Sequence, residues 1–133
     1  MFALALKIPK ESLERKIHGL VPAGVRRADG VGLAIPLSDR RKGVVVSLGI
    51  QHVIENARLA VSIWGSPTGE NWGERPLLSF PPKSYCGLYT AFVAASALGG
   101  VRYLRASWKI SRSASTGPEP FFGFSVTADE PGL

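Results

Sequence analysis

The sequence has few residues of the kinds that build disulfides and metal sites. Its 133 residues include one cysteine, Cys86, and two histidines, His18 and His52. A single cysteine excludes an intrachain disulfide and a cysteine-based metal site. The two histidines stand far apart in the chain and lack the close ligand spacing of a zinc or iron site. We therefore expect no metal or other cofactor, histidines at or near the surface, and a buried, unreactive Cys86.

Patterns typical of catalytic and membrane proteins are missing as well. The chain has no Gly-x-Ser-x-Gly elbow, no Gly-x-Gly-x-x-Gly turn and no Walker-type Gly-Lys-Ser/Thr, so we expect a protein that is not an enzyme. Its apolar runs are far shorter than the roughly 20 residues of a membrane span. The first residues lack the basic leader and cleavage site of a secretion signal, which predicts cytoplasmic synthesis, with release only as part of a particle.

The positive charge is concentrated in the N-terminal third. The net charge is +6, and residues 1–42 hold nine Lys or Arg against four Asp or Glu, which is +5 of the +6. This bias indicates either a solvated basic face or a surface for nucleic acid, anionic lipid or an acidic protein. The basic residues predicted to lie at such an interface are Arg26, Arg27, Arg40, Arg41 and Lys42.

The pattern allows one short helix, near the start of the chain. A serine is suited to cap it, and Leu13, Ile17 and Leu20 recur at helical spacing on one side. A glycine and a proline limit it to about two turns, too few for stability alone, so the alternative is an extended segment along a neighbour. We divide the chain into a basic N-terminal arm, residues 1–30, and a β-sandwich domain, residues 31–133.

Beyond residue 30 the apolar residues recur with the period of two that is typical of strands. Six to eight short strands are expected, among them residues 31–35, 44–48, 59–63, 76–80, 87–94, 104–110 and 122–128. The β-branched run at 44–48 predicts a strand covered on both faces, and the run at 87–94 is apolar on both faces. Fifteen Gly and ten Pro without a repeat period fit many turns. We predict an all-β protein, an antiparallel β-sandwich of jelly-roll or Greek-key topology.

The three tryptophans differ in what their positions imply. Trp72 follows Glu70 and Asn71 in a loop, an arrangement that suits a sugar ring stacked on the indole, although a tryptophan at such a junction more often caps a sandwich core. Trp64 is out of phase with the apolar residues of its strand and faces the opposite side, which indicates an interface if that side is uncovered. Trp108 is in phase with its apolar neighbours and is predicted to lie in the core.

Three short motifs resemble those of known proteins. LAVSIWGSPTGENW at residues 59–72 and VRYLRA at residues 101–106 resemble discoidin-like, or galactose-binding-like, β-sandwiches. PFFGFSV at residues 120–126 resembles the last strand of small phage virion or decoration-type proteins that reuse this pattern. The resemblance covers residues 59–128 and implies a β-sandwich. Extracellular discoidin domains usually carry a disulfide, whereas this chain has one cysteine and is expected to carry no secretion signal, so the virion type is favoured. The ligand-binding loops of those domains do not align with this chain, so no binding residue is transferred.

Three functions remain open from the sequence. The first is a structural subunit, whose N-terminal arm reaches a neighbouring copy in a homo-oligomeric, virion-like particle. The second is a carbohydrate- or ligand-binding module of the discoidin-like type, with Trp72, Asn71 and Glu70 as its binding residues. The third is a nucleic-acid-associated protein that binds through the basic N-terminal third, and such binding should weaken steeply with salt.

Overall fold

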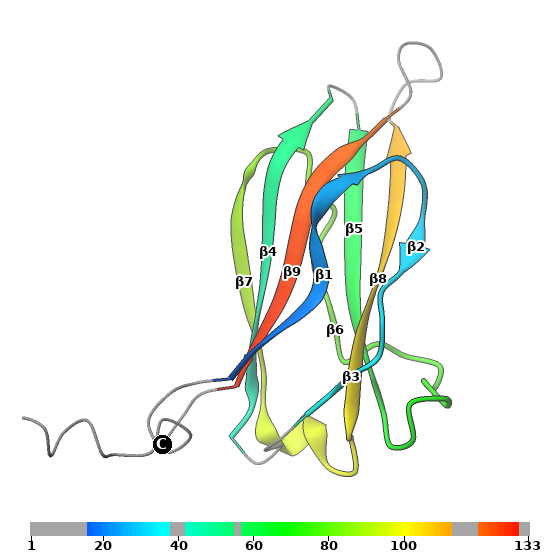
Figure 1. The fold of residues 1–133 in the computed structure, drawn as a ribbon, viewed down its shortest axis with the longest axis vertical. Helices are drawn as coiled ribbons and strands as arrows, with labels where there is room; N and C mark the ends of the chain where they lie inside the picture. The colour runs from blue at the N-terminus through cyan, green and yellow to red at the C-terminus, as the bar shows by residue number, and fades with distance from the viewer. Residues whose placement is uncertain (1–15, 38–41, 55–56, 113–119, 131–133) are drawn as a thin grey trace, which may run out of the picture.

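Two antiparallel sheets face each other (Figure 1), with one apolar core between them. This computed structural model describes residues 16–37, 42–54, 57–112 and 120–130. One sheet has the strand order β1-β9-β4-β7, and the other has the order β2-β8-β5-β6, with β3 also paired to β8. The strands are β1 Lys16–Arg26, β2 Gly30–Val31, β3 Ile35–Pro36, β4 Val44–Val53, β5 Ala57–Ser66, β6 Leu78–Ser79, β7 Gly87–Val93, β8 Tyr103–Arg112 and β9 Phe122–Glu130. The prediction of an all-β antiparallel sandwich is confirmed.

The strand order is that of a jelly roll. β2 and β3 pair with β8 at successive places along one edge and count as a single interrupted strand, which gives eight strand positions in the described chain. Along the sequence, the chain crosses from one sheet to the other at every step except between β5 and β6. Two sheets of four positions joined in this way form the double-sheet jelly roll.

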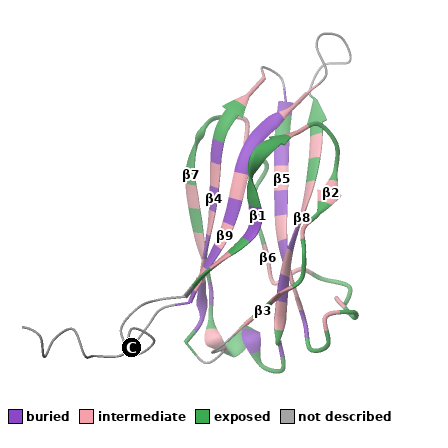
Figure 2. Cartoon of the chain, viewed as in Figure 1, coloured by how far each residue is buried: buried purple, intermediate pink, exposed green. Residues whose placement is uncertain are grey.

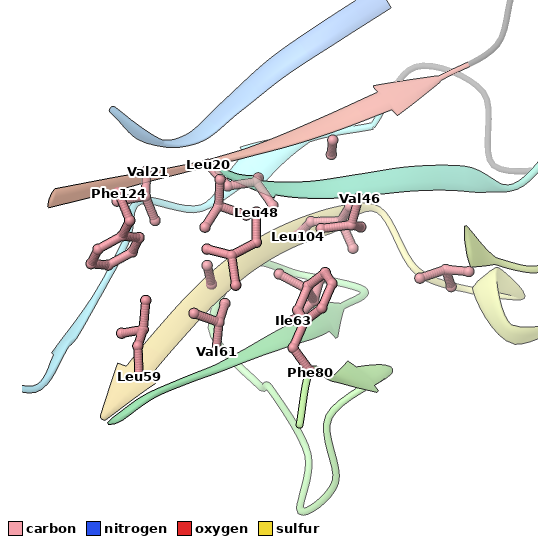
Figure 3. Packing of buried hydrophobic residues seen from close by; sticks show 14 of the residues in the cluster. Leu20, Val21, Val46, Leu48, Leu59, Val61, Ile63, Phe80, Leu104 and Phe124 are labelled. Atoms are coloured by element: carbon pink, nitrogen blue, oxygen red, sulfur yellow. The ribbon is translucent and has the colours of Figure 1, made fainter. Parts of the chain in front are cut away.

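The core fills the space between the two sheets. In Figure 3, Leu59, Val61 and Ile63 of β5 lie across from Val46 and Leu48 of β4. All five side chains are fully buried. Burying an aliphatic side chain of this size stabilises the fold by about 1.5–3 kcal/mol. These facing rows therefore hold the two sheets together.

Side chains alternate between the two faces of β8 and β9, and those on one face enter the core. The inward residues of β9 are buried, as predicted: Phe122, Phe124, Val126 and Ala128. In β8, Leu104 and Ala106 are buried, and Trp108 packs against the core from a half-buried position. The Trp108 ring meets that of Phe124 edge-on, with centroids 5.6 Å apart, a geometry that aromatic pairs favour.

The helix predicted near the start is wrong where the structure describes the chain. Lys16 begins β1, which pairs antiparallel with β9. Leu20 and Val21 are buried in the core, whereas Ile17 is exposed. A two-turn helix gains few internal hydrogen bonds, and pairing with β9 satisfies the backbone along most of the strand. The first part of the predicted helix, residues 12–15, lies outside the described residues.

The sandwich begins before the boundary predicted at residue 31. β1 forms one edge of the four-stranded sheet and contributes two buried residues to the core. β1 is therefore part of the sandwich rather than of a separate arm, because it pairs with β9 along its length and buries Leu20 and Val21, although Ile17 and Val25 are exposed. The rest of the predicted arm, residues 1–15, lies outside the described residues.

The run at residues 31–35 is not the half-buried strand that its apolar residues predict. Val31 and Leu33 are exposed, and only the two ends of the run pair with β8. At Gly30, a Cβ would meet the Trp108 ring at 2.4 Å. The space beneath this edge is already filled by the tryptophan, so the larger side chains turn outward.

The outer face of β4 is only partly covered, contrary to prediction, and that of the neighbouring β7 is largely open. The outward residues of β4 are half-buried, and β7 exposes Leu88 and Phe92 on its outer face. Figure 2 shows green, exposed stretches along β7. The described chain forms only two layers, so the outer face of this sheet has no third layer upon it. Cys86 is also exposed, rather than buried as predicted, because it lies just before β7 where the chain crosses between the sheets.

Candidate functional site

The loop between β5 and β6 is held by its own side chains. The buried Ser66 hydroxyl accepts hydrogen bonds from the backbone N–H groups of Thr68 and Gly69, at 3.1 and 2.8 Å. Thr68 Oγ1 accepts one from the Glu70 N–H at 3.2 Å, and Asn71 Oδ1 accepts one at 3.1 Å from the N–H two residues on. Small polar side chains commonly take the place of backbone partners in turns. The loop thus presents the predicted ligand residues in a defined geometry.

Trp72 lies against the outer face of the five-stranded sheet. The Arg105 guanidinium of β8 stacks on its ring, 4.4 Å from the centroid. Trp64 of β5 lies on the same face, opposite Arg105 in the strand register, and its Nε1 donates to Ser107 Oγ at 2.9 Å. Both indole rings are half-buried. Trp64 faces away from the core, as its phase predicts, and part of its surface is covered within the protomer.

The contact between Arg105 and Trp72 covers part of the ligand site predicted at Glu70, Asn71 and Trp72. One face of the Trp72 ring is occupied by the Arg105 guanidinium, and the Asn71 side-chain oxygen is bonded to the loop backbone. A cation on an indole face contributes about 0.5–2 kcal/mol, so the contact fixes the loop on the sheet. Glu70 and Asn71 are exposed beside it. The binding role of these three residues stays a prediction.

Arg26 closes the edge of the sandwich between β1 and β8. Its guanidinium lies 5.4 Å from the ring centroid of Trp108 and 5.2 Å from that of Phe124. Its Nη2 donates to the Pro22 carbonyl at 2.8 Å, and its Nη1 donates to the Gly24 carbonyl at 3.1 Å. The side chain is thus engaged within the protomer. The sequence pattern did not reveal this role, because the two rings come from strands distant in the chain.

The other basic residues predicted at an interface are scattered. Arg27 is exposed, with its guanidinium 5.3 Å from the ring centroid of Phe121. Lys42 is exposed just before β4. Arg40 and Arg41 lie outside the described residues.

The sheet register separates the two described groups of basic residues. Arg26 pairs with Phe122, which in turn pairs with Val53 at the far end of β4. Lys42 precedes the near end of that strand. The two groups therefore stand at opposite ends of the four-stranded sheet, and the residues that the structure describes do not combine into one basic patch.

His18 makes a polar contact that the sequence did not indicate. Its Nε2 is hydrogen-bonded to Oε2 of Glu130, a carboxylate only 3% exposed at the end of β9. His52 is exposed. Within the described ranges, no group of three or more His, Cys, Asp or Glu side chains could hold a metal ion. No helix in the same ranges is long and apolar enough to cross a membrane.

The surface that the sequence analysis missed is the edge strand β7. Leu88 and Phe92 are 71% and 58% exposed on this strand, and Tyr85, two residues before it, is 77% exposed. The one signal in the sequence is the absence of charge from its seven residues. The absence of charge is equally typical of a buried central strand. Only the strand order shows that β7 is an edge strand.

Comparison with known proteins gives a likeness of fold. Neither a protein-family model nor a curated protein matches this sequence. Among solved structures, a chain in the structure of the Gx strain of infectious bursal disease virus superposes with a TM-score of 0.56 at 8% sequence identity. The match covers 91% of this chain and 34% of the viral one, so this chain spans about a third of that length. The two chains share the β-sandwich fold.

Proposed function

We propose that this protein is a non-enzymatic structural subunit that associates with copies of itself into a virion-like particle. The observation that carries the proposal is the likeness of its fold, over 91% of the chain, to a chain of a virus structure. Double-sheet jelly rolls recur in viral capsid domains. The exposed apolar strand β7 supports the proposal further, because apolar side chains gathered on a surface commonly mark a protein interface.

Size-exclusion chromatography with light scattering tests the proposal on the full chain. We expect a mass several times the 14.2 kDa of one chain at micromolar protein, and closed particles or regular lattices in the electron microscope. A single species of 14.2 kDa at high micromolar concentration contradicts the proposal.

Carbohydrate binding of the discoidin-like type is the second candidate. The jelly roll also serves lectin domains, and Glu70, Asn71 and Trp72 share one ordered loop. If a glycan array identifies a bound sugar, Trp72→Ala should weaken its binding at least about tenfold, a loss of about 1.4 kcal/mol. Trp64→Ala is the matched control, on the same face but outside the loop. An array without a bound sugar, or binding that Trp72→Ala leaves unchanged, excludes this candidate.

Nucleic-acid binding is the third candidate, and the separation of the described basic residues does not favour it. Retention on immobilised DNA or RNA at low salt, falling steeply as salt rises, would support it. The absence of retention at low salt excludes it.

A further inference from the structure

Three of the four sheet edges carry features that block pairing with another strand. β1 contains Pro22 and two shifts of register against β9, and Arg26 covers two of its carbonyl groups. β6 has two residues and is followed by Pro81 and Pro82. On the opposite edge of that sheet, β2 and β3 also have two residues each, and β3 ends at Pro36. Prolines, bulges and short strands are the means by which proteins prevent edge-to-edge pairing.

β7 is the fourth edge and carries none of these features. Its seven residues pair with β4 without a shift of register and include no proline and no charged residue. No strand in the described part of the chain pairs with its other side. Leu88 and Phe92 are exposed on its outer face. β7 therefore offers free backbone hydrogen-bonding groups beside apolar side chains, which is the kind of surface to which an extended segment adds.

The chain itself holds a segment with a matching pattern. Fifteen residues precede β1. Among them, large apolar residues alternate with small or charged ones: Phe2, Leu4, Leu6 and Ile8 alternate with Ala3, Ala5 and Lys7. A period of two is typical of a strand with one apolar face. Residues 2–8 equal β7 in length, and Pro9 ends the run.

The position of Lys16, the first residue of β1, limits how residues 2–8 can pair with β7 of the same chain. Lys16 lies at the same end of the sheet as Val93 of β7. It pairs with the last residue of β9, the end of β9 pairs with the start of β4, and the start of β4 pairs with Val93. A strand added outside β7 would lie four strand spacings, about 19 Å, from Lys16. From Ile8 to Lys16 the chain spans at most about 26–29 Å. Within one chain, residues 2–8 thus reach β7 readily with Ile8 at the Val93 end, which makes the two strands parallel.

Antiparallel pairing within one chain is at the limit of reach. Ile8 would have to lie at the Gly87 end of β7, about 20 Å further along the sheet, at a total distance of about 28 Å from Lys16. The linker would then be fully stretched across the outer face of three strands. Antiparallel pairing is slightly the more stable arrangement per residue, and a second copy allows it without stretching the linker.

We propose that residues 2–8 of one copy add antiparallel to β7 of another copy, with Ile8 beside Leu88 and Leu4 beside Phe92. In this register the large side chains of the segment cover the exposed leucine and phenylalanine of β7. Pairing then provides backbone hydrogen bonds and apolar burial together. The inference rests on the proposed self-association and names the contact that produces it.

Cys86 is a natural site for chemical cross-linking, because it is the only cysteine in the sequence and lies exposed just before β7. Full-length chain carrying Ile8→Cys and Cys86→Ser is unfolded, mixed with wild-type chain, refolded and treated with a short bis-maleimide. In the proposed register, the thiol introduced by Ile8→Cys lies about 8 Å from Cys86 of the other copy. We expect a covalent product of two chains, joined between those two thiols in the mass spectrum of its peptides.

The matched control carries Phe2→Cys and Cys86→Ser at the other end of the same segment. In the proposed register its thiol lies about 27 Å from Cys86 of the other copy, so its yield should be at least about fivefold lower. Equal yields, or no product from either variant, overturn the proposal. A higher yield from Phe2→Cys indicates parallel pairing and also overturns it.

Two further outcomes separate the alternatives. A product within one chain, formed when Ile8→Cys is combined with native Cys86 at high dilution, shows pairing within the chain and contradicts the proposal. Wild-type chains cross-linked through Cys86 of each copy place two β7 edges together and contradict it as well. If the protein is oligomeric by light scattering but no product forms, this inference fails while the proposed function stands. A monomer removes both.

Discussion

At the scale of the residue, single polar side chains stabilise places where the sheets are incomplete. Arg26 donates hydrogen bonds to two carbonyl groups in the irregular part of β1, and its guanidinium lies over two aromatic rings. Both carbonyl groups lie at the second shift of register between β1 and β9, and a charged donor forms stronger hydrogen bonds than a neutral one. Arg26 therefore acts as a structural residue at the edge of the sandwich.

Replacing Arg26 with alanine should lower the free energy of unfolding by about 1–3 kcal/mol, because it removes three hydrogen bonds to carbonyl groups and both ring contacts. Arg27→Ala is the matched control, since that guanidinium is exposed beside one ring. We expect the control to lose less than about 0.5 kcal/mol. Urea denaturation followed by tryptophan fluorescence measures both, and equal losses would show that Arg26 has no special role.

His18→Ala should destabilise the protein by about 1–3 kcal/mol, because it deprives the buried Glu130 carboxylate of a hydrogen bond. His52→Ala serves as the control, since the His52 side chain is exposed and its loss should change stability by no more than about 0.5 kcal/mol. Thermal unfolding followed by circular dichroism compares the two. A His18→Ala protein that melts with the wild type would mean that Glu130 needs no imidazole partner.

At the scale of the element, the turn that leads into β4 fixes how β7 lies beside it. Gly43 has a φ of 81°, a backbone conformation that glycine adopts without strain and other residues rarely adopt. A Cβ at Gly43 would meet Phe92 Cζ at 2.5 Å and the Val93 carbonyl oxygen at 2.8 Å. Glycine is thus required here twice, for the turn and for the close approach of the β7 end.

Gly43→Ala should therefore cost about 2–4 kcal/mol of stability, the sum of left-handed strain and a clash with β7. Gly73→Ala is matched in conformation, with a φ of 72°, but has nothing within 4 Å of the added carbon. It should cost only the conformational strain, about 1 kcal/mol. Chemical denaturation of both variants measures the difference, and equal losses would show that the contact with β7 contributes nothing.

At the scale of the whole molecule, the four sheet edges are unequal. Three of them carry prolines, shifts of register or strands of two residues, whereas β7 is regular, uncharged and apolar on its outer face. A jelly roll whose strands are blocked on every edge but one can extend its sheets in one direction only. In the proposed association, β7 is therefore the edge at which another strand can add.

Leu88→Lys should weaken self-association by about tenfold or more, equivalent to about 1.4 kcal/mol, while leaving the stability of the protomer unchanged within about 0.5 kcal/mol. A lysine on the outer face of β7 is the kind of charge that proteins use to protect an edge. Leu33→Lys is the matched control, because Leu33 is equally exposed but lies away from β7. Sedimentation over a range of concentrations measures both, and equal weakening would place the contact elsewhere.

Several elements could be predicted because their own side chains specify them. The alternation in β5, β8 and β9 predicts strands with one buried face, and the turn residues between them predict an antiparallel sandwich. The helix near the start failed because residues 16–18 gain more from pairing with β9 than a two-turn helix offers. The packing of Trp72 against the sheet could not be predicted from the sequence, because its partner Arg105 comes from a strand distant in the chain.

The sequence by itself determined the class of fold, through the period of two in β5, β8 and β9, and it determined the lack of the usual catalytic and metal-binding patterns. Tertiary structure alone decided which strand stands at an open edge, which face of residues 31–35 turns inward, and which partners Arg26 and His18 contact. The physical reason is that periodicity is a local property of the chain. Strand order and side-chain partnership arise between segments far apart in sequence, and no local pattern encodes them.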